Sequence, residues 1–426
     1  MLQSALNYAQ SNQKNNLEQL KSLLRIPSVS TLPNRKTDVQ QAAQWLADKL
    51  TAIGLENVQV MPTPGHPVVY ADWLHAGRDV PTVIVYGHYD VQPPDPLDEW
   101  RTPPFEPTVQ GDDLFGRGTA DDKGQLYVHI AAAEAYLQTS GALPLNLKFM
   151  LEGEEELGST HLGAFIRENR ELLAADAALI SDTHMINPQT PVLVTSVRGL
   201  VYMEITMRGS ATDLHSGMYG GAVENPLHAM VGLLNSLRDE QGRVTIPGFY
   251  DAVRPLTPAE RAALNNGHVT DETILAETGG PALFGEAGYT VAERIGARPT
   301  LDIHGIRGGF IGEGQKTVIP AEVTAKVSMR LVPDQNPAEI AQLFADHVRA
   351  IAPPTMEISV KKLSAEPGAL VDMDTPAIES AAQAFQTVFG QRPVFLREGG
   401  SIPVVAMFDH LLNAPVVMMG FGLPDD

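Results

Sequence analysis

Four short clusters of histidine and acidic residues follow apolar, strand-like segments in the first half of the chain. They are Gly87–Asp90, Ala120–Gly124, Glu152–Glu156 and Ser181–Asp182. This placement constrains the fold, because an open α/β sheet brings residues just beyond the carboxyl ends of its strands to one edge. Imidazole and carboxylate groups that converge at such an edge would form a site for metal ions.

The composition restricts the ligands of such a site to nitrogen and oxygen. The chain has no cysteine, which excludes thiolate ligands and disulfides. Acidic residues number 51 against 30 basic ones, and the net charge of −21 disfavours binding to nucleic acid or anionic membranes. No segment approaches the roughly 20 apolar residues of a membrane span. Because the N-terminus also lacks the layout of a signal peptide, we expect a cytoplasmic location.

The first part of the chain predicts a mainly parallel sheet covered by helices. Apolar strand-like segments alternate there with helical ones, which is typical of that architecture. The expected strands span 56–61, 67–74, 81–87, 145–151 and 176–181. The expected helices span 37–53, 123–138 and 160–173. The same pattern returns near the end of the sequence, with a helix at 375–389 and a strand at 414–421.

A second pattern begins near residue 195. Residues 200–208 alternate as a half-exposed antiparallel strand does, and a helix is expected at 224–238. After the Pro- and Gly-rich stretch 246–316, a strand, a helix and a strand are expected at 322–331, 336–351 and 356–362. These elements favour a split β-α-β unit, an α+β domain of ferredoxin-like type with a long insertion.

The chain is therefore predicted to be a two-domain α/β protein. Its 426 residues exceed one ordinary core, which is consistent with this division. We expect a catalytic metal-binding domain at 1–196 and 368–426. A lid and dimerisation domain at 197–367 would be inserted into it.

His88 and Asp90 form the first candidate pair. A histidine that leaves a buried strand can bind metal at the sheet edge, although a single one is more simply a hydrogen-bonded core residue. Three further clusters with the same placement favour ligation. Asp90 points to the same side in extended chain and could hold the tautomer of the imidazole.

The acidic clusters also have two interpretations each. Asp121 and Asp122 precede a helix, so they could cap it, or one of them could bridge two cations. Glu155 and Glu156 point in different directions, so one could bind metal while the other acts as general base. They could equally form a solvated acidic turn. Asp182 offers a further ligand, or is an ordinary turn residue.

These motifs, in this order, resemble the M20 metallopeptidases. The resemblance is greatest to the branch of carnosinase-like, cytosolic non-specific dipeptidases, and it extends over essentially the whole chain. The similar segments are 87–93, 116–124, 152–156, 181–182, 213–221, 316–320, 328–334 and 397–403.

The resemblance implies a role for each acidic cluster. His88 and Asp182 would bind one metal ion, Glu156 the other, and Asp121 would bridge both. The two ions would be Zn²⁺ or Mn²⁺, and they would hold a water as hydroxide and polarise the peptide carbonyl. Glu155 would be the general base that passes the proton of the water to the leaving amine.

The resemblance also implies a homodimer and a site for the carboxylate of the substrate. His215 would stabilise the oxyanion in the active site of the other subunit. Arg330, with Thr317 and Ser401 near it, would hold the C-terminal carboxylate of a small peptide, because an Arg fork suits a carboxylate. Without the resemblance, a surface ion pair formed by Arg330 on a strand is a plausible alternative.

One implied metal ligand has no counterpart in the sequence. The family supplies a last histidine soon after its final strand, whereas this sequence ends at Asp426 without one. His410 is the only histidine after residue 360, and its apolar, helix-like surroundings favour packing over ligation. We expect the missing ligand to lie beyond the given residues; without it, one metal site would be weak and activity low.

The expected function is hydrolysis of dipeptides or short peptides. An N-acyl amino acid deacylase or a small-peptide carboxypeptidase is the near alternative, and the abundant carboxylates favour a substrate with a free ammonium group. A catalytically inactive dimeric binding protein of the same fold is a third possibility. A nucleotide-binding role finds no support, because the sequence has no phosphate-binding Gly-Lys-Ser/Thr loop.

Overall fold

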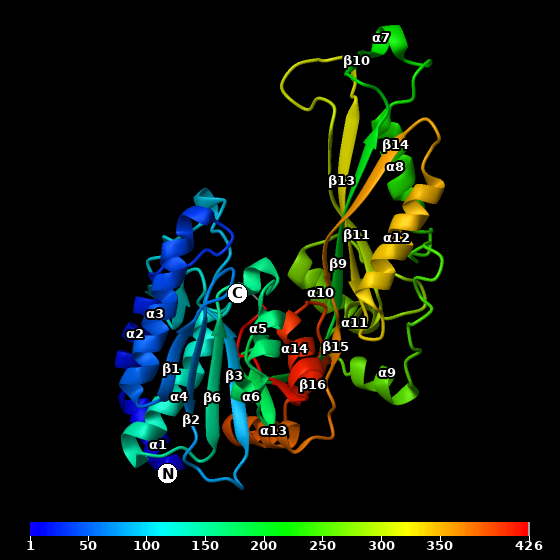
Figure 1. Cartoon of the computed structure of the whole chain (residues 1–426). Helices are drawn as coiled ribbons and strands as arrows, with labels where there is room; N and C mark the ends of the chain where they lie inside the picture. The colour runs from blue at the N-terminus through cyan, green and yellow to red at the C-terminus, as the bar shows by residue number, and fades with distance from the viewer. Residues whose placement is uncertain (425–426) are drawn as a thin grey trace. The chain divides into compact units, whose positions relative to one another are not determined.

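The computed structural model describes residues 1–424 and divides the chain into two compact units (Figure 1). The first unit comprises Met1–Thr195, Val371–Phe395 and the segment from Pro403 onward. The second comprises Ser196–Leu370 and Leu396–Ile402. Along the sequence, the second unit is therefore inserted into the first. The short segment Leu396–Ile402 was not anticipated from the sequence.

A large sheet forms the centre of the first unit, with the strand order β1-β2-β6-β3-β7-β17-β8. The four strands β6, β3, β7 and β17 run parallel, and the strands on either side of them pair antiparallel. This confirms the prediction of a large, mainly parallel sheet. The strands are β1 (Glu56–Met61), β2 (Val68–Trp73), β3 (Thr82–His88), β6 (Asn146–Glu152), β7 (Ala177–Ile180), β8 (Val192–Val197) and β17 (Val416–Met418).

Helices cover both faces of this sheet (Figure 1). On one face, α3 and α4 pack on the strands through a core that includes Leu46, Val69 and Phe149. On the other face, Lys148 of β6 donates hydrogen bonds to the carbonyls of Leu172 and Ala174, which anchors α6. The helices are α1 (Leu2–Ser11), α2 (Gln13–Leu24), α3 (Lys36–Ile53), α4 (Lys123–Ser140), α5 (Leu162–Glu168), α6 (Arg170–Leu173), α13 (Pro376–Phe389) and α14 (Pro403–Met407).

Two features of these helices bear on the predictions. The helix expected at 160–173 is divided, because α5 ends at Glu168 and the side chain of the following Asn169 donates to the carbonyl of Phe165. Among residues 1–424, no helix is both long and apolar enough to span a membrane.

The second unit contains a four-stranded antiparallel sheet with the order β11-β13-β9-β14. Along the chain the elements follow as β9-α8-β11-β13-α12-β14, which is a β-α-β-β-α-β succession. Their bounds are β9 (Gly199–Arg208), α8 (Pro226–Ser236), β11 (Thr300–Gly308), β13 (Glu322–Leu331), α12 (Pro337–Ile351) and β14 (Glu357–Glu366). Met203, Met230 and Phe344 belong to the core that the two helices form with the sheet.

The stretch 246–316, which had no clear sequence pattern, contains three short helices and the edge strand β11. The helices are α9 (Pro258–Leu264), α10 (Asp271–Thr278) and α11 (Val291–Ala297). The strand was missed because two glycines and a bulge between Ile303 and Gly305 interrupt its alternation. Small two-stranded pairs complete the structure: β4 (Thr108–Gln110) with β5 (Asp113–Phe115), and β10 (Leu214–His215) with β12 (Val318–Ile319).

Candidate metal centre

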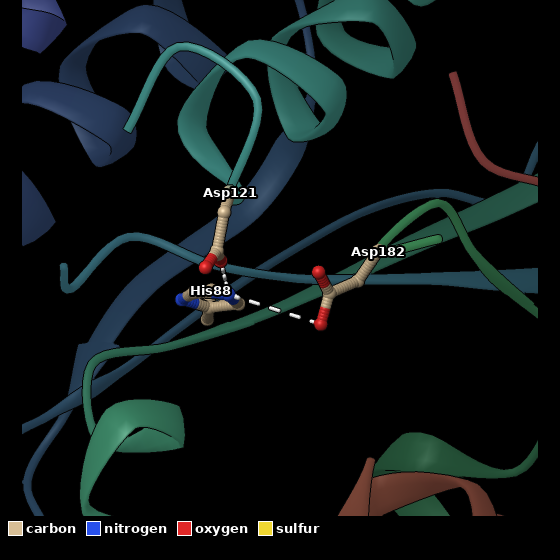
Figure 2. Close-up of side chains that lie close together, drawn as sticks. All are labelled: His88, Asp121 and Asp182. Carbon is tan, nitrogen blue, oxygen red and sulfur yellow. Dashed lines mark ion pairs between the residues drawn. The ribbon is translucent and has the colours of Figure 1, made fainter. Parts of the chain in front are cut away.

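Three of the expected metal ligands lie together at the carboxyl end of the central strands. Figure 2 shows His88 at the end of β3, Asp182 after β7 and Asp121 ahead of α4, with their side chains directed toward one another. His88 Nε2 lies 2.9 Å from Asp121 Oδ1 and 3.8 Å from Asp182 Oδ2. Within the described part of the chain, these three residues form the group of ligand atoms that could hold one metal ion.

The hydrogen bonds of His88 leave one imidazole nitrogen for a cation. Nδ1 lies 3.0 Å from the backbone carbonyl of Asp90, to which it can only donate. Nε2 is fully buried and makes no hydrogen bond of normal geometry, although two carboxylates face it. A neutral Nε2 and carboxylate oxygens are all acceptors, so only a proton or a cation can satisfy them together. The donor set therefore fits a divalent metal.

The pKa of His88 reflects the same arrangement. Burial by itself lowers this pKa, but the nearby carboxylates of Asp121, Asp90 and Asp182 outweigh burial, so the pKa stands well above its usual value. The carboxylates that would share a cation with Nε2 thus also favour positive charge on the imidazole. Because a histidine ligand must be neutral, metal binding at this site should depend on pH.

Asp90 connects the histidine to the loop that carries the glutamates. Its carboxylate is fully buried, lies 3.4 Å from His88 Nδ1 and accepts a 2.6 Å hydrogen bond from the Ser30 hydroxyl. It also accepts the backbone N–H groups of Glu155 (3.2 Å) and Glu156 (3.1 Å). One carboxylate thereby positions both the strand end and the glutamate loop.

Replacing Asp90 by asparagine is expected to weaken this junction, because an amide nitrogen cannot accept the bonds that Asp90 Oδ2 accepts. Leaving a buried donor without a partner costs about 1–3 kcal/mol, so the metal-free protein should lose about 2 kcal/mol of unfolding free energy in denaturant titrations. Metal affinity should also fall roughly 10- to 100-fold. Ser30→Ala removes only one donor and should change metal affinity much less. Unchanged metal affinity in Asp90→Asn would contradict this role.

The two adjacent aspartates before α4 have different environments. Asp121 is 62% exposed and faces His88, whereas Asp122 is buried. Asp122 stands at the N-cap position, but its carboxylate makes no capping bond; instead Oδ2 accepts the backbone N–H of His88 at 3.1 Å. Of the two interpretations offered by the sequence, capping by these side chains is therefore wrong for Asp122.

Asp182 is held by contacts of the residue before it. The Ser181 hydroxyl donates to the carbonyl of Met419 at 2.7 Å, and His129 of α4 lies 2.7 Å from the same hydroxyl. Burial lowers the pKa of His129 to about 4, so the ring is neutral and donates one hydrogen bond to the hydroxyl. This network fixes the end of β7 beside β17.

Glu155 and Glu156 lie in a short 3-10 turn that follows β6. Burial raises the pKa of Glu155 well above its ordinary value; the charge of His88 opposes this rise, and the carboxylates of Asp182, Glu152 and Asp90 add to it. Burial and then the charge of Asp121 raise the pKa of Glu156 to about 7. Gln92 donates a 2.6 Å hydrogen bond to Glu156 Oε2. Glu156 does not belong to the group of three ligand residues, although the charge of Asp121 affects its pKa.

In the second unit, Arg330 and Ser401 are in direct contact. Arg330 lies near the end of β13, and its Nη1 donates a 2.7 Å hydrogen bond to Ser401 Oγ. The pKa of Glu366 is raised by burial, which the positive charge of Arg330 partly offsets. Arg330 thus donates to a hydroxyl, whereas its simpler interpretation from the sequence was a surface ion pair.

Thr317 and His215 lie together, at the opposite end of the same strand. The carbonyl of Thr317 accepts the N–H of Ser216 at 3.1 Å, and His215 pairs with Val318 in the small β10–β12 sheet. Strand β13 separates this pair from Arg330; from Glu322 to Arg330 it spans about 26 Å, at roughly 3.3 Å per residue. Within one chain, the structure therefore does not bring Thr317 near Arg330, in contrast to the sequence expectation.

His410 is not part of the site among the described residues. It lies in the π-helical turn Phe408–Leu412, where it is exposed and has Asp409 as its near neighbour at 3.9 Å. Ser30 and Gln92 were not predicted from the sequence, and Asp122 was not predicted to accept the backbone N–H of His88. Only the position of Gln92 and Asp122 inside the motifs could have indicated them.

Comparison with known proteins decides the family. The model of peptidase family M20/M25/M40 matches residues 84–426, which is most of the chain. The chain belongs to this family. It is 34% identical to a Cys-Gly metallodipeptidase of Schizosaccharomyces pombe over 427 residues, which covers 96% of this chain and 88% of that protein.

Solved structures of the family have the same fold. Human carnosine dipeptidase 1 superposes with a TM-score of 0.87 at 30% identity, covering 100% of this chain and 92% of that chain. An M20 metallo-carboxypeptidase from Sulfolobus solfataricus has a TM-score of 0.85 at 30% identity, with coverage of 95% and 90%. The family resemblance recognised in the motifs is thereby confirmed.

Proposed function

We propose that the protein is a metal-dependent dipeptidase. The observation that carries this proposal is the orphaned Nε2 of His88, enclosed by Asp121 and Asp182 in a chain of the M20 family. The relatives named Cys-Gly metallodipeptidase and carnosine dipeptidase support small peptides of two residues as substrates.

The chain offers ligands for two divalent cations, Zn²⁺ or Mn²⁺. His88 and Asp182 would hold one cation, Glu156 the other, and Asp121 would bridge them. The bridging role is supported by the position of Asp121, which lies 2.9 Å from His88 and whose charge raises the pKa of Glu156. Carboxylate-rich ligation is compatible with either metal. When bound, the cations would polarise the peptide carbonyl and lower the pKa of a water.

Glu155 is the general base in this proposal. Its buried carboxylate has a raised pKa, which suits a group that must take a proton near neutral pH. Glu155 accepts a proton from the attacking water and delivers it to the nitrogen of the leaving amine as the peptide bond breaks. Asp90, through the two backbone N–H groups that it accepts, holds Glu155 and Glu156 in place while it orients His88.

The second unit supplies the groups that hold the substrate. Arg330, oriented by Ser401, would bind the terminal carboxylate of the dipeptide, and His215 would donate to the oxyanion. As a lid, this unit would close over the metal centre when substrate binds. A cytoplasmic location stays a prediction from the sequence.

We also propose that each complete site uses two subunits. His215 and Thr317 lie at one end of β13 and Arg330 at the other, so a partner subunit must supply one of these sets. The segments beside His215 expose apolar side chains, as an interface would: Met218 and Tyr219 in α7 (Ser216–Tyr219) and Phe310 and Ile311 in the loop before β12. A homodimer through the lid unit accounts for both observations.

A mixing experiment tests the shared site. His215→Ala and Glu155→Gln should each be nearly inactive alone. After unfolding and refolding together, half of the dimers carry both variants, and each of these has one intact site. Activity should return to about a quarter of the parent value in a two-fold symmetric dimer. No recovery, although mixed dimers form by native mass spectrometry, would refute a shared site.

Hydrolysis of a free dipeptide, compared with its N-acetylated counterpart, tests the main proposal. The protein would be stripped of metal and assayed with and without added Zn²⁺ or Mn²⁺. We expect cation-dependent cleavage of the free dipeptide alone. Preference for the acetylated compound would indicate a deacylase, and release of C-terminal residues from longer peptides would indicate a carboxypeptidase. Metal binding without cleavage of any of these would indicate an inactive binding protein.

A further inference from the structure

Arg198, immediately before β9, holds the loop that carries Ser401. Its backbone N–H donates to the carbonyl of Gly400 at 2.8 Å, and its Nε donates to the carbonyl of Gly399 at 2.9 Å. Its own carbonyl accepts the Ser401 hydroxyl at 2.5 Å. Three consecutive residues of the loop are therefore bound by one arginine, through both its backbone and its side chain.

These contacts determine what the Ser401 hydroxyl can do. A hydroxyl has a single proton, and Ser401 donates it to the carbonyl of Arg198. Its oxygen is then an acceptor, and it receives the 2.7 Å hydrogen bond from Nη1 of Arg330. The chain Arg198–Ser401–Arg330 thus fixes the direction of the Arg330 guanidinium.

The side chain of Arg198 is suited to this task. Its Nη1 also donates to the carbonyl of Arg298 at 3.3 Å, so the guanidinium joins the loop to the segment before β11. Burial, together with the charge of Arg330, lowers the pKa of Arg198 to about 10, so it remains a cation at neutral pH. Backbone carbonyls, which are neutral, allow two guanidinium groups to lie in the same region.

We propose that Arg198 is a positioning residue of the carboxylate subsite, which acts by fixing loop 398–401 so that Ser401 orients Arg330. This inference rests on the proposed function, in which Arg330 binds the terminal carboxylate of the dipeptide. Arg198 itself contacts neither the substrate nor the metal ions. Its loss should weaken substrate binding while the chemical step is spared.

The test compares a free dipeptide with its C-terminal amide, using the full chain loaded with metal. In Arg198→Gln, KM for the free dipeptide should rise about tenfold, the effect of one disturbed charge-assisted hydrogen bond, with kcat within about twofold. KM for the amide, which lacks the carboxylate, should change little. Arg198→Lys, which keeps the charge and one donor, should restore part of the loss. Arg208→Gln, which removes an arginine from the far end of β9, is the matched control.

Two further measurements separate positioning from general instability. In a Ser401→Ala background, Arg198→Gln should add little to KM, because both act through the same hydroxyl. Amide hydrogen exchange should become faster over 396–402, while β9 and β13 stay protected as in the parent. Additive effects in the double variant, an equal rise of KM for the amide, or unchanged exchange over 396–402 would each overturn the proposal.

The Arg330→Met variant shows which proposal has failed. It should reduce the discrimination between free dipeptide and amide. If it does not, the carboxylate subsite is wrong, and the role of Arg198 there is overturned with it. If Arg330→Met reduces the discrimination and Arg198→Gln does not, only the role of Arg198 is overturned.

Discussion

Replacing Glu155 by glutamine is expected to lower kcat for dipeptide hydrolysis by about two to four orders of magnitude, the usual contribution of a general base. Glutamine keeps the size of the side chain and the backbone N–H that Asp90 accepts, so the loop should keep its position. Metal affinity, measured by titration of the metal-free protein, should change far less than kcat.

A neighbouring glutamate provides the control for this substitution. The carboxylate of Glu154 pairs with His161 at 2.9 Å, away from the group of ligands. Glu154→Gln should therefore retain kcat within a few-fold. If Glu155→Gln also retained it, the base would have to be another group, and the assignment of Glu155 would fail.

Replacing Asp121 by asparagine is expected to abolish cation-dependent activity and to weaken metal binding more than about 100-fold. Asp121 faces His88 and influences Glu156, so its loss affects both proposed cations. At a cation concentration 100 times the parent Kd, binding stabilises the parent by about 2.7 kcal/mol. A 100-fold weaker variant would gain only about 0.4 kcal/mol under the same conditions.

Thermal unfolding with and without cation measures this difference without relying on activity. Asp121 adjoins the buried His88, so each variant is compared with its own metal-free form, which separates the effect of the cation from any change in metal-free stability. Asp113→Asn, the same charge change at an exposed position at the start of β5, should keep the full stabilisation by cation. Equal stabilisation of Asp121→Asn and the parent would remove Asp121 from the ligand set.

The parts of the fold that follow simple periodicity could be predicted from the sequence. Strands β3 and β6 are largely apolar and buried, because helices cover both of their faces, and they lie close to their expected bounds. Strand β11 could not be predicted in this way. Its bulge at His304 and its glycines conceal the alternation, and the antiparallel partner that stabilises it, β13, begins only after residue 321.

Some residues of the candidate site could likewise be predicted from the sequence, and others could not. His88, Asp121 and Asp182 were predictable, because each follows or precedes an element whose end is fixed by the sheet. The separation of Thr317 from Arg330 was not predictable. Both residues are close to β13 in the sequence, but they lie at its opposite ends. The role of Arg198 depends on a loop about 200 residues away, which no local pattern encodes.

The buried carboxylate of Asp90 mechanically couples the proposed metal ligand His88 to the proposed base Glu155. Because one side chain adjoins His88 and accepts the N–H groups of both glutamates, we expect a displacement of the glutamate loop to be transmitted to His88 on β3. Substitutions in this loop should therefore shift cation affinity and turnover in parallel. In a redesigned enzyme, the base could therefore not be exchanged independently of metal binding, because both depend on the contacts of Asp90.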